Sequence, residues 1–160
     1  MNQQGTQLIA TAQRLCDQAH VGQVDKAGKP YAEHPRRVAG YVKAGNASAA
    51  AAALLHDVLE DTSMTSTDLA AAGIGADVIE VVELLTRSED AAGDEYYRHI
   101  RAHPIAWEVK LADLADNTDP DRLALLRPAD RSRLMAKYAA AYAALGADPS
   151  DADHRRRSRC

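Results

Sequence analysis

The 160-residue sequence has no phenylalanine, one tryptophan and two cysteines, and aromatic residues make up 4% of it. Two cysteines, Cys16 and Cys160, exclude a disulfide framework and a cysteine-rich zinc finger. The shortage of aromatic residues also disfavours β-sheets, whose strands are enriched in aromatic and β-branched side chains. Alanine and leucine are abundant instead, and both favour helices. The composition therefore predicts an all-α protein with an aliphatic core.

Long apolar runs are missing too, and none approaches the roughly 18 residues that a membrane-spanning helix needs. The first residues lack the basic and then apolar pattern of a secretory signal peptide. The formal net charge is -4, and a mildly acidic chain is atypical of proteins that bind nucleic acid through a basic face. We therefore expect a cytoplasmic protein without a membrane or nucleic-acid partner.

Apolar residues recur at helical spacing along most of the chain. The first predicted helix covers residues 8–20 and is followed by a loop over residues 21–30. Two more helices are expected from Pro35 to Gly45 and over residues 47–59, the second in an alanine-rich stretch. Further helices are predicted over residues 66–72, 76–86, 90–103, 104–115, 120–126 and 128–145.

These elements predict a single domain, a compact multi-helix bundle over residues 1–146. The remaining residues, 147–160, are polar and contain four arginines and three aspartates. Such a segment has little apolar surface to bury, so we expect a disordered, arginine-rich C-terminal tail.

Ionisable residues gather at the end of the third predicted helix. His56 and Asp57 interrupt an apolar stretch, and Glu60 and Asp61 follow one helical turn later. Burying an imidazole beside a carboxylate costs several kcal/mol unless both are paired or bind a metal ion. Three carboxylates so close together repel one another, and a divalent cation would relieve that repulsion. The alternative is a capped helix end followed by a solvated acidic turn.

Two more residues of the same chemistry favour the metal hypothesis. His34 and Asp113 both occupy helical positions with apolar neighbours. Two histidines and two aspartates form a mixed nitrogen and oxygen ligand set that suits Mn²⁺, Fe²⁺ or Zn²⁺.

The order of these residues resembles the HD-domain metal-dependent phosphohydrolases. The resemblance is strongest to the hydrolase domain of RelA/SpoT-type alarmone enzymes and their small stand-alone relatives. It extends over nearly the whole chain, from about residue 8 to residue 145. The segments that carry it are residues 19–23, 26–35, 53–62 and 109–113 with Asn117. The most specific is the pattern HDxxED within an apolar helix, from His56 to Asp61.

The resemblance implies a site with three groups of residues. One Mn²⁺ ion would be held by His34, His56, Asp57 and Asp113. Glu60 and Asp61 would orient or deprotonate the attacking water. The substrate would be contacted by Lys26, Asn117, Tyr138 and Lys137.

The reaction implied is removal of the 3′-pyrophosphate from guanosine tetra- or pentaphosphate, a small-molecule nucleotide. A chain of this length leaves no room for the synthetase domain of longer family members, so we expect hydrolysis alone. Besides Lys26 and Lys137, the side chains that can offset the phosphate charge are Arg37, Arg87 and Lys110.

Two positions depart from the family pattern. Asp25 lies where alarmone hydrolases usually have an arginine, and Asp116 lies where an uncharged or aromatic residue is expected. Asp25 reverses the charge of the loop that would meet the substrate, which favours an alternative nucleotide such as a dinucleotide 2′-phosphate. A third hypothesis is a nucleotide sensor without catalytic activity, although the Glu60–Asp61 pair argues against a pure binder.

Overall fold

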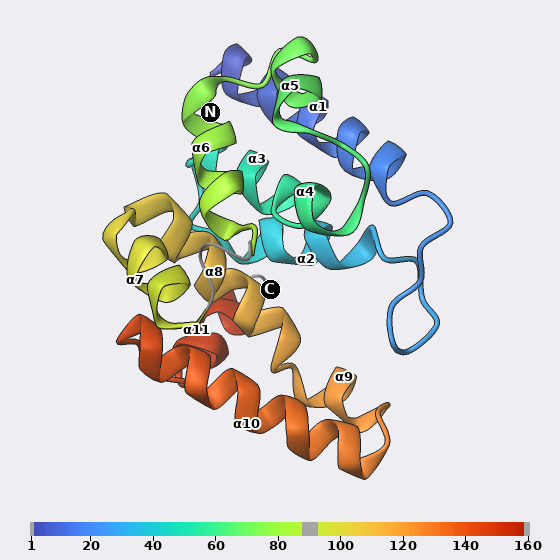
Figure 1. The fold of residues 1–160 in the computed structure, drawn as a ribbon, viewed down its shortest axis with the longest axis vertical. Helices are drawn as coiled ribbons and strands as arrows, with labels where there is room; N and C mark the ends of the chain where they lie inside the picture. Colours follow the sequence, from blue (N-terminus) through green and yellow to red (C-terminus); the bar gives the residue numbers. More distant parts are fainter. Residues whose placement is uncertain (1, 88–92, 159–160) are drawn as a thin grey trace.

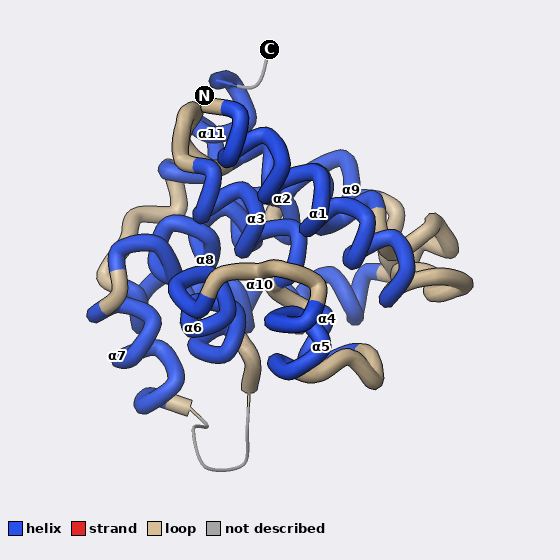
Figure 2. The backbone as a smooth tube through the Cα atoms, turned by 90° about the horizontal axis from the view of Figure 1, so that it is seen from above, coloured by secondary structure: helices blue, strands red, loops and turns tan. Residues whose placement is uncertain are grey.

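The computed structural model describes residues 2–87 and 93–158. These residues form eleven α-helices, and Figure 2 shows no strand among them. One isolated bridge between Val24 and Pro30 closes the loop after the first helix. The helices, in chain order, are α1 (Gln3–Ala19), α2 (Glu33–Tyr41), α3 (Ala47–Leu55), α4 (Val58–Asp61), α5 (Ser66–Ala71), α6 (Ala76–Leu85), α7 (Asp94–Ala102), α8 (Pro104–Asn117), α9 (Pro120–Ala124), α10 (Pro128–Leu145) and α11 (Asp151–Ser158).

The all-α bundle predicted from composition is confirmed, with the helices bounded by the residues that mark helix ends in the sequence. Asn46 caps α3 by accepting a hydrogen bond from the amide of Ala49 at 2.9 Å. Prolines occupy the first turn of α8, α9 and α10, where a missing amide hydrogen costs nothing. Gly146 ends α10 with φ of 63°, a left-handed conformation that glycine adopts without strain.

The alanine-rich helix α3 lies at the centre of the bundle and contacts α1, α2, α6 and α8 (Figure 1). Its side chains from Ala51 to Leu55 are all buried. Small side chains allow neighbouring helix axes to approach closely, so a core without phenylalanine can still be densely packed. The central position of α3 brings its C-terminal end between α2 and α8.

The third predicted helix does not continue to residue 59. It ends at Leu55, His56 and Asp57 form a turn, and the short helix α4 follows. The Nδ1 atom of His56 contacts the carbonyl oxygen of Ala53 at 2.7 Å, so a side chain takes the place of a backbone donor at this point. Helix propensity alone predicts an uninterrupted helix, because it does not take this side-chain hydrogen bond into account.

The prediction of a disordered tail is wrong for residues 151–158, which form α11. Arg155 donates hydrogen bonds to both carboxylate oxygens of Glu108, at 2.8 and 3.0 Å, and to the carbonyl oxygen of Tyr41 at 3.0 Å. Ala152 is buried against the bundle. A polar composition suggested solvation, but the arginine finds a carboxylate buried on α8 and pairs with it.

Smaller differences concern helix ends. The first helix begins at Gln3 rather than residue 8, because the side chain of Asn2 caps it. The second ends at Tyr41 rather than Gly45. Of the predicted helix over 90–103, residues 90–92 lie outside the described part of the chain. No described helix combines the length and the apolar character required to cross a membrane.

Candidate active site

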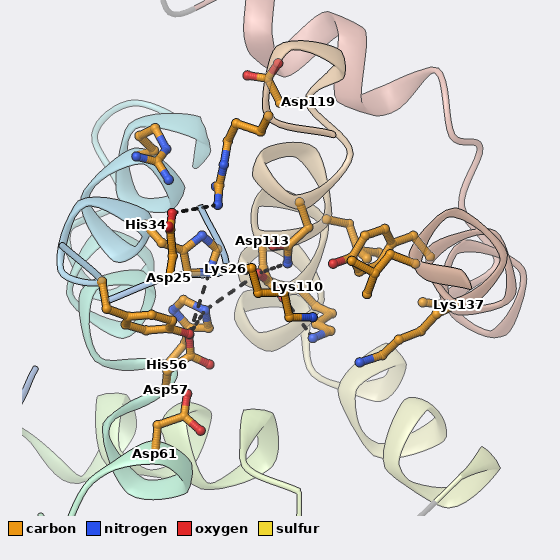
Figure 3. Close-up of a pocket in the computed structure, with 18 of the residues that line it drawn as sticks. Asp25, Lys26, His34, His56, Asp57, Asp61, Lys110, Asp113, Asp119 and Lys137 are labelled. Atoms are coloured by element: carbon orange, nitrogen blue, oxygen red, sulfur yellow. Dashed lines mark hydrogen bonds and ion pairs between the residues drawn. The ribbon is translucent and has the colours of Figure 1, made fainter. Parts of the chain in front are cut away.

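The four predicted metal ligands come from three places in the fold and meet at one point (Figure 3). His34 lies in the first turn of α2, His56 and Asp57 form the turn between α3 and α4, and Asp113 lies on α8. The Nε2 atom of His56 is 3.0 Å from Asp57 Oδ2, and that of His34 is 3.2 Å from Asp113 Oδ1. Ligand atoms of His34, His56 and Asp57 all lie within 4.8 Å of one another.

The protonation of both imidazoles follows from their partners. His56 Nδ1 faces a carbonyl oxygen, and His34 Nδ1 faces Oδ2 of Asp116 at 2.7 Å. Carbonyl and carboxylate oxygens accept but do not donate, so each Nδ1 carries a proton, and the neutral ring then has its lone pair on Nε2.

Both Nε2 atoms point at carboxylates, which cannot donate a hydrogen bond to them. His56 Nε2 is buried and has no hydrogen-bond partner, although Asp57 Oδ2 is close by. Burial alone would lower the pKa of His56, but the Asp57 carboxylate beside it raises that pKa well above its ordinary value, so without a metal ion a proton occupies Nε2. A buried nitrogen that faces a carboxylate needs a positive charge between them, and a metal ion can take the place of this proton. The residues therefore fit a divalent metal ion of the kind that imidazole and carboxylate ligands prefer.

Asp113 is held by two further residues of α8. Lys110 Nζ donates to its Oδ2 at 2.8 Å, and Asn117 Nδ2 donates to its Oδ1 at 2.6 Å. Burial alone would raise the pKa of Asp113, but the Lys110 ammonium beside it holds the pKa well below its ordinary value. Asp113 is therefore a carboxylate at neutral pH, as a ligand must be.

Tyr31 is a site residue that the ligand pattern does not single out. Its hydroxyl donates to Asp57 Oδ2 at 2.6 Å, and its ring contacts those of His20 and His34. Burial and the charge of Asp57 raise the pKa of Tyr31, so the hydroxyl stays protonated and remains a donor. The sequence could have indicated Tyr31, because it lies in the segment 26–35 that resembles the family.

The predicted acid–base pair lies on α4, one turn beyond the ligands. Burial, together with the charge of Asp57, raises the pKa of both Glu60 and Asp61 above their ordinary values. Both side chains line the same cavity as the ligand cluster. A carboxyl group with a raised pKa beside a cavity can take up or release a proton closer to neutral pH.

The cavity has a volume of about 810 Å³, large enough for a nucleotide. Its lining includes all four predicted substrate residues, Lys26, Asn117, Tyr138 and Lys137. It also includes Arg87 and Lys110, which, with Lys26 and Lys137, form the cationic wall of the cavity. Burial and these positive neighbours lower the pKa of Lys137. In Figure 3, Lys137 extends from α10 toward Lys110, on the side of the cavity away from His34.

Asn117, a predicted substrate contact, and Asp25, the departure from the family pattern, both have partners within the protein. The Asn117 amide bonds to Asp113, which places it beside the ligand cluster. Asp25, the departure in the loop, accepts hydrogen bonds from the amides of Ala27 and Lys29 and lies 3.6 Å from Arg122. Sequence reasoning missed Arg122, because nothing near it in the chain marks it as part of the site.

Known proteins share both sequence and fold with this chain. A family profile described as "HD domain" matches residues 12–148. Over 130 residues, the chain is 36% identical to guanosine-3′,5′-bis(diphosphate) 3′-pyrophosphohydrolase of Haemophilus influenzae, covering 74% of this chain and 19% of that protein. It is 33% identical over 138 residues to the bifunctional (p)ppGpp synthase/hydrolase SpoT of Escherichia coli, covering 79% of this chain and 20% of that protein.

The chain thus spans about a fifth of the length of these curated relatives. Among solved structures, it is similar to one described as a metazoan ortholog of SpoT that hydrolyses ppGpp and has a role in starvation responses. The TM-score is 0.73, the sequence identity is 22%, and the match covers 95% of each chain. At this identity, the likeness shows that the fold is shared.

Proposed function

The chain belongs to the HD domain family, and from this membership we propose that it is a Mn²⁺-dependent phosphohydrolase that removes the 3′-pyrophosphate from guanosine tetra- or pentaphosphate. The observation that carries the proposal is a single cavity that joins the ligand cluster, the Glu60–Asp61 pair and the cationic wall. The names of two relatives, a guanosine-3′,5′-bis(diphosphate) 3′-pyrophosphohydrolase and a (p)ppGpp synthase/hydrolase, support the choice of substrate.

His34, His56, Asp57 and Asp113 would hold the ion. When bound, the ion would supply Lewis-acid chemistry at a phosphoryl oxygen and would make a water molecule more acidic. Tyr31 holds Asp57 by a hydrogen bond, and Asn117 and Lys110 hold Asp113. These contacts orient the carboxylates before a substrate arrives.

Glu60 and Asp61 would handle the proton. The reaction adds water across the bond between the ribose 3′ oxygen and phosphorus, so the water oxygen goes to phosphorus and a proton goes to the sugar oxygen. One carboxylate takes the proton from the water, and a carboxyl group returns a proton to the leaving oxygen. Their raised pKa values suit both steps near neutral pH.

The cationic wall would bind the phosphates. Arg87 is exposed and lies over the rings of Tyr96 and Tyr97, and Lys110 lies against Asp113. Lys26 and Lys137 reach the same cavity from a loop and from α10. A cluster of positive groups in a concave site attracts a highly charged nucleotide more strongly than it attracts a monophosphate.

Product analysis tests the proposal. The purified protein is incubated with Mn²⁺ and, separately, with guanosine tetraphosphate, guanosine pentaphosphate and a dinucleotide 2′-phosphate, and the products are separated by ion-exchange chromatography. We expect guanosine diphosphate and pyrophosphate from the tetraphosphate. Faster hydrolysis of the dinucleotide 2′-phosphate would support the alternative substrate, and binding without turnover would support a nucleotide sensor.

We also propose that the protein acts in the cytoplasm on free nucleotides, without a nucleic-acid or membrane partner. The net charge of -4 and the buried free thiol of Cys16 support this location and this partner class.

A further inference from the structure

Asp116 is fully buried beside the ligand cluster, yet it is not one of the predicted ligands. Its Oδ2 accepts from His34 Nδ1 at 2.7 Å, and its Oδ1 accepts from Arg37 Nε at 2.7 Å. Arg37 Nη2 lies 3.2 Å from Oδ2, and Arg122 Nη1 donates to the same oxygen. One carboxylate therefore joins an imidazole to two guanidinium groups.

The two arginines explain how this carboxylate can be buried. Removing a carboxylate from water is costly unless it is paired and hydrogen-bonded, and both of its oxygens are satisfied here. Arg37 comes from α2 and Arg122 from α9, so the cluster also connects these helices to α8. A purely structural ion cluster would account for the burial of Asp116 and for its contacts with the two arginines.

A purely structural role of Asp116 does not explain its contact with His34. The Asp116 oxygen faces Nδ1 of the imidazole whose Nε2 faces the candidate metal position. His56, the other imidazole, is fixed by the backbone carbonyl of Ala53, which no substitution removes. The hydrogen bond at His34 Nδ1 therefore depends on one side chain, whereas the one at His56 Nδ1 depends on the backbone.

We propose that Asp116, held by Arg37 and Arg122, is the positioning residue that sets the tautomer and orientation of His34 and thereby the metal affinity of the site. The inference rests on the proposed function in one respect, namely that His34 is a metal ligand. A carboxylate that accepts from the outer nitrogen of a metal-binding histidine fixes its tautomer and makes the inner nitrogen a stronger ligand.

Asp116→Asn tests the role with little change in shape. An asparagine amide can either accept a hydrogen bond from His34 Nδ1 or donate one to it, and donation favours the tautomer with the proton on Nε2, which cannot bind metal through Nε2. We expect the affinity for Mn²⁺, measured by calorimetric titration of the metal alone, to fall about 10- to 100-fold. In ¹⁵N NMR spectra of the metal-free protein, the His34 tautomer should shift away from the Nδ1-protonated form.

Glu108→Gln is the matched control. Glu108 is also buried on α8, about two turns earlier, and also pairs with an arginine, but its partners are Arg155 and the amide of Lys43. Loss of this carboxylate should lower the melting temperature while leaving Mn²⁺ affinity and the His34 tautomer unchanged. Equal losses of affinity in both variants would overturn the inference, because any broken ion pair on α8 would then loosen the site.

Asp116→Asn leaves two arginines without their carboxylate and could unfold the protein. The double variant Asp116→Asn with Arg122→Gln removes one negative and one positive charge together, so the charge of the cluster stays the same. An unchanged affinity and tautomer in either folded variant also overturns the inference. If the unaltered protein binds no Mn²⁺, the proposed metal site fails instead, so the two failures are distinguishable.

Discussion

His56 Nδ1 and the carbonyl oxygen of Ala53 are 2.7 Å apart, and this one hydrogen bond has two consequences. It occupies a carbonyl that would otherwise accept from the backbone four residues later, and α3 ends there. It also fixes the proton on Nδ1, which leaves the buried Nε2 facing Asp57. The same hydrogen bond thus separates α3 from α4 and orients His56 as a metal ligand.

Asp57→Ala should abolish both metal binding and activity. The unaltered protein loaded with Mn²⁺ is expected to hold about one ion per chain, because the described ligand atoms surround one position. Elemental analysis after desalting measures the occupancy. Glu80→Ala, which removes an exposed carboxylate from α6, serves as the control and should bind as the unaltered protein does. Full occupancy in Asp57→Ala would show that the ligand assignment is wrong.

Glu60→Gln and Asp61→Asn should separate chemistry from binding. Each keeps the shape of the side chain and removes its ability to exchange a proton, so kcat should fall by about 10²- to 10⁴-fold. Mn²⁺ occupancy and the affinity for a non-hydrolysable nucleotide should be retained. Loss of the metal together with activity would instead make these side chains ligands.

The raised pKa of Glu60 also predicts how the stability of the metal-free protein depends on pH. A carboxyl group whose pKa is raised on folding stabilises the fold most below its ordinary value of 4.5, and this contribution is lost as the pH rises through the raised pKa. Glu60→Gln cannot ionise, so its melting temperature at neutral pH should exceed that of the unaltered metal-free protein. The difference should shrink in acid, and a constant difference across the pH range would contradict the prediction.

Arg155→Met should destabilise the fold by about 3 kcal/mol, because it leaves the Glu108 carboxylate buried without its partner. Urea unfolding followed by circular dichroism measures the loss. Arg157→Met, an exposed position on the same helix, should change the stability little. Equal effects of the two substitutions would mean that α11 contributes through helix formation alone and that the buried pair adds nothing.

Asp25→Asn should lower KM for guanosine tetraphosphate by up to about tenfold, equivalent to 1.4 kcal/mol. Asparagine can still accept from the amides of Ala27 and Lys29, so the loop keeps its shape while a negative charge leaves the cavity. The gain should shrink as salt concentration rises. Lys26→Ala should raise KM, and unchanged KM values in both variants would place the loop away from the substrate.

The sequence by itself determined the fold class, because alanine-rich helical periodicity and the prolines and glycines at helix ends are local signals. HDxxED in an apolar helix also indicated His56 and Asp57, because buried ionisable groups need a common partner, whereas Lys26, Asn117, Tyr138 and Lys137 came from the family resemblance. Glu60 and Asp61 could be predicted from the same pattern, because they follow the ligands by one helical turn. All ten predicted site residues line the same cavity.

Tertiary structure alone decided the contacts between residues far apart in the chain. Asp116 meets His34 across 82 positions, and Arg155 meets Glu108 across 47, so neither pairing leaves a periodic trace in the sequence. The same holds for Arg122, which approaches Asp25 only when α9 and the loop after α1 are folded together. The composition of residues 151–158 predicted a solvated segment, but in the structure they form a helix whose Arg155 pairs with a buried carboxylate on α8. The sequence shows the sign of each charged side chain. Which partner it meets, and therefore the free energy of burying it, depends on how the helices pack.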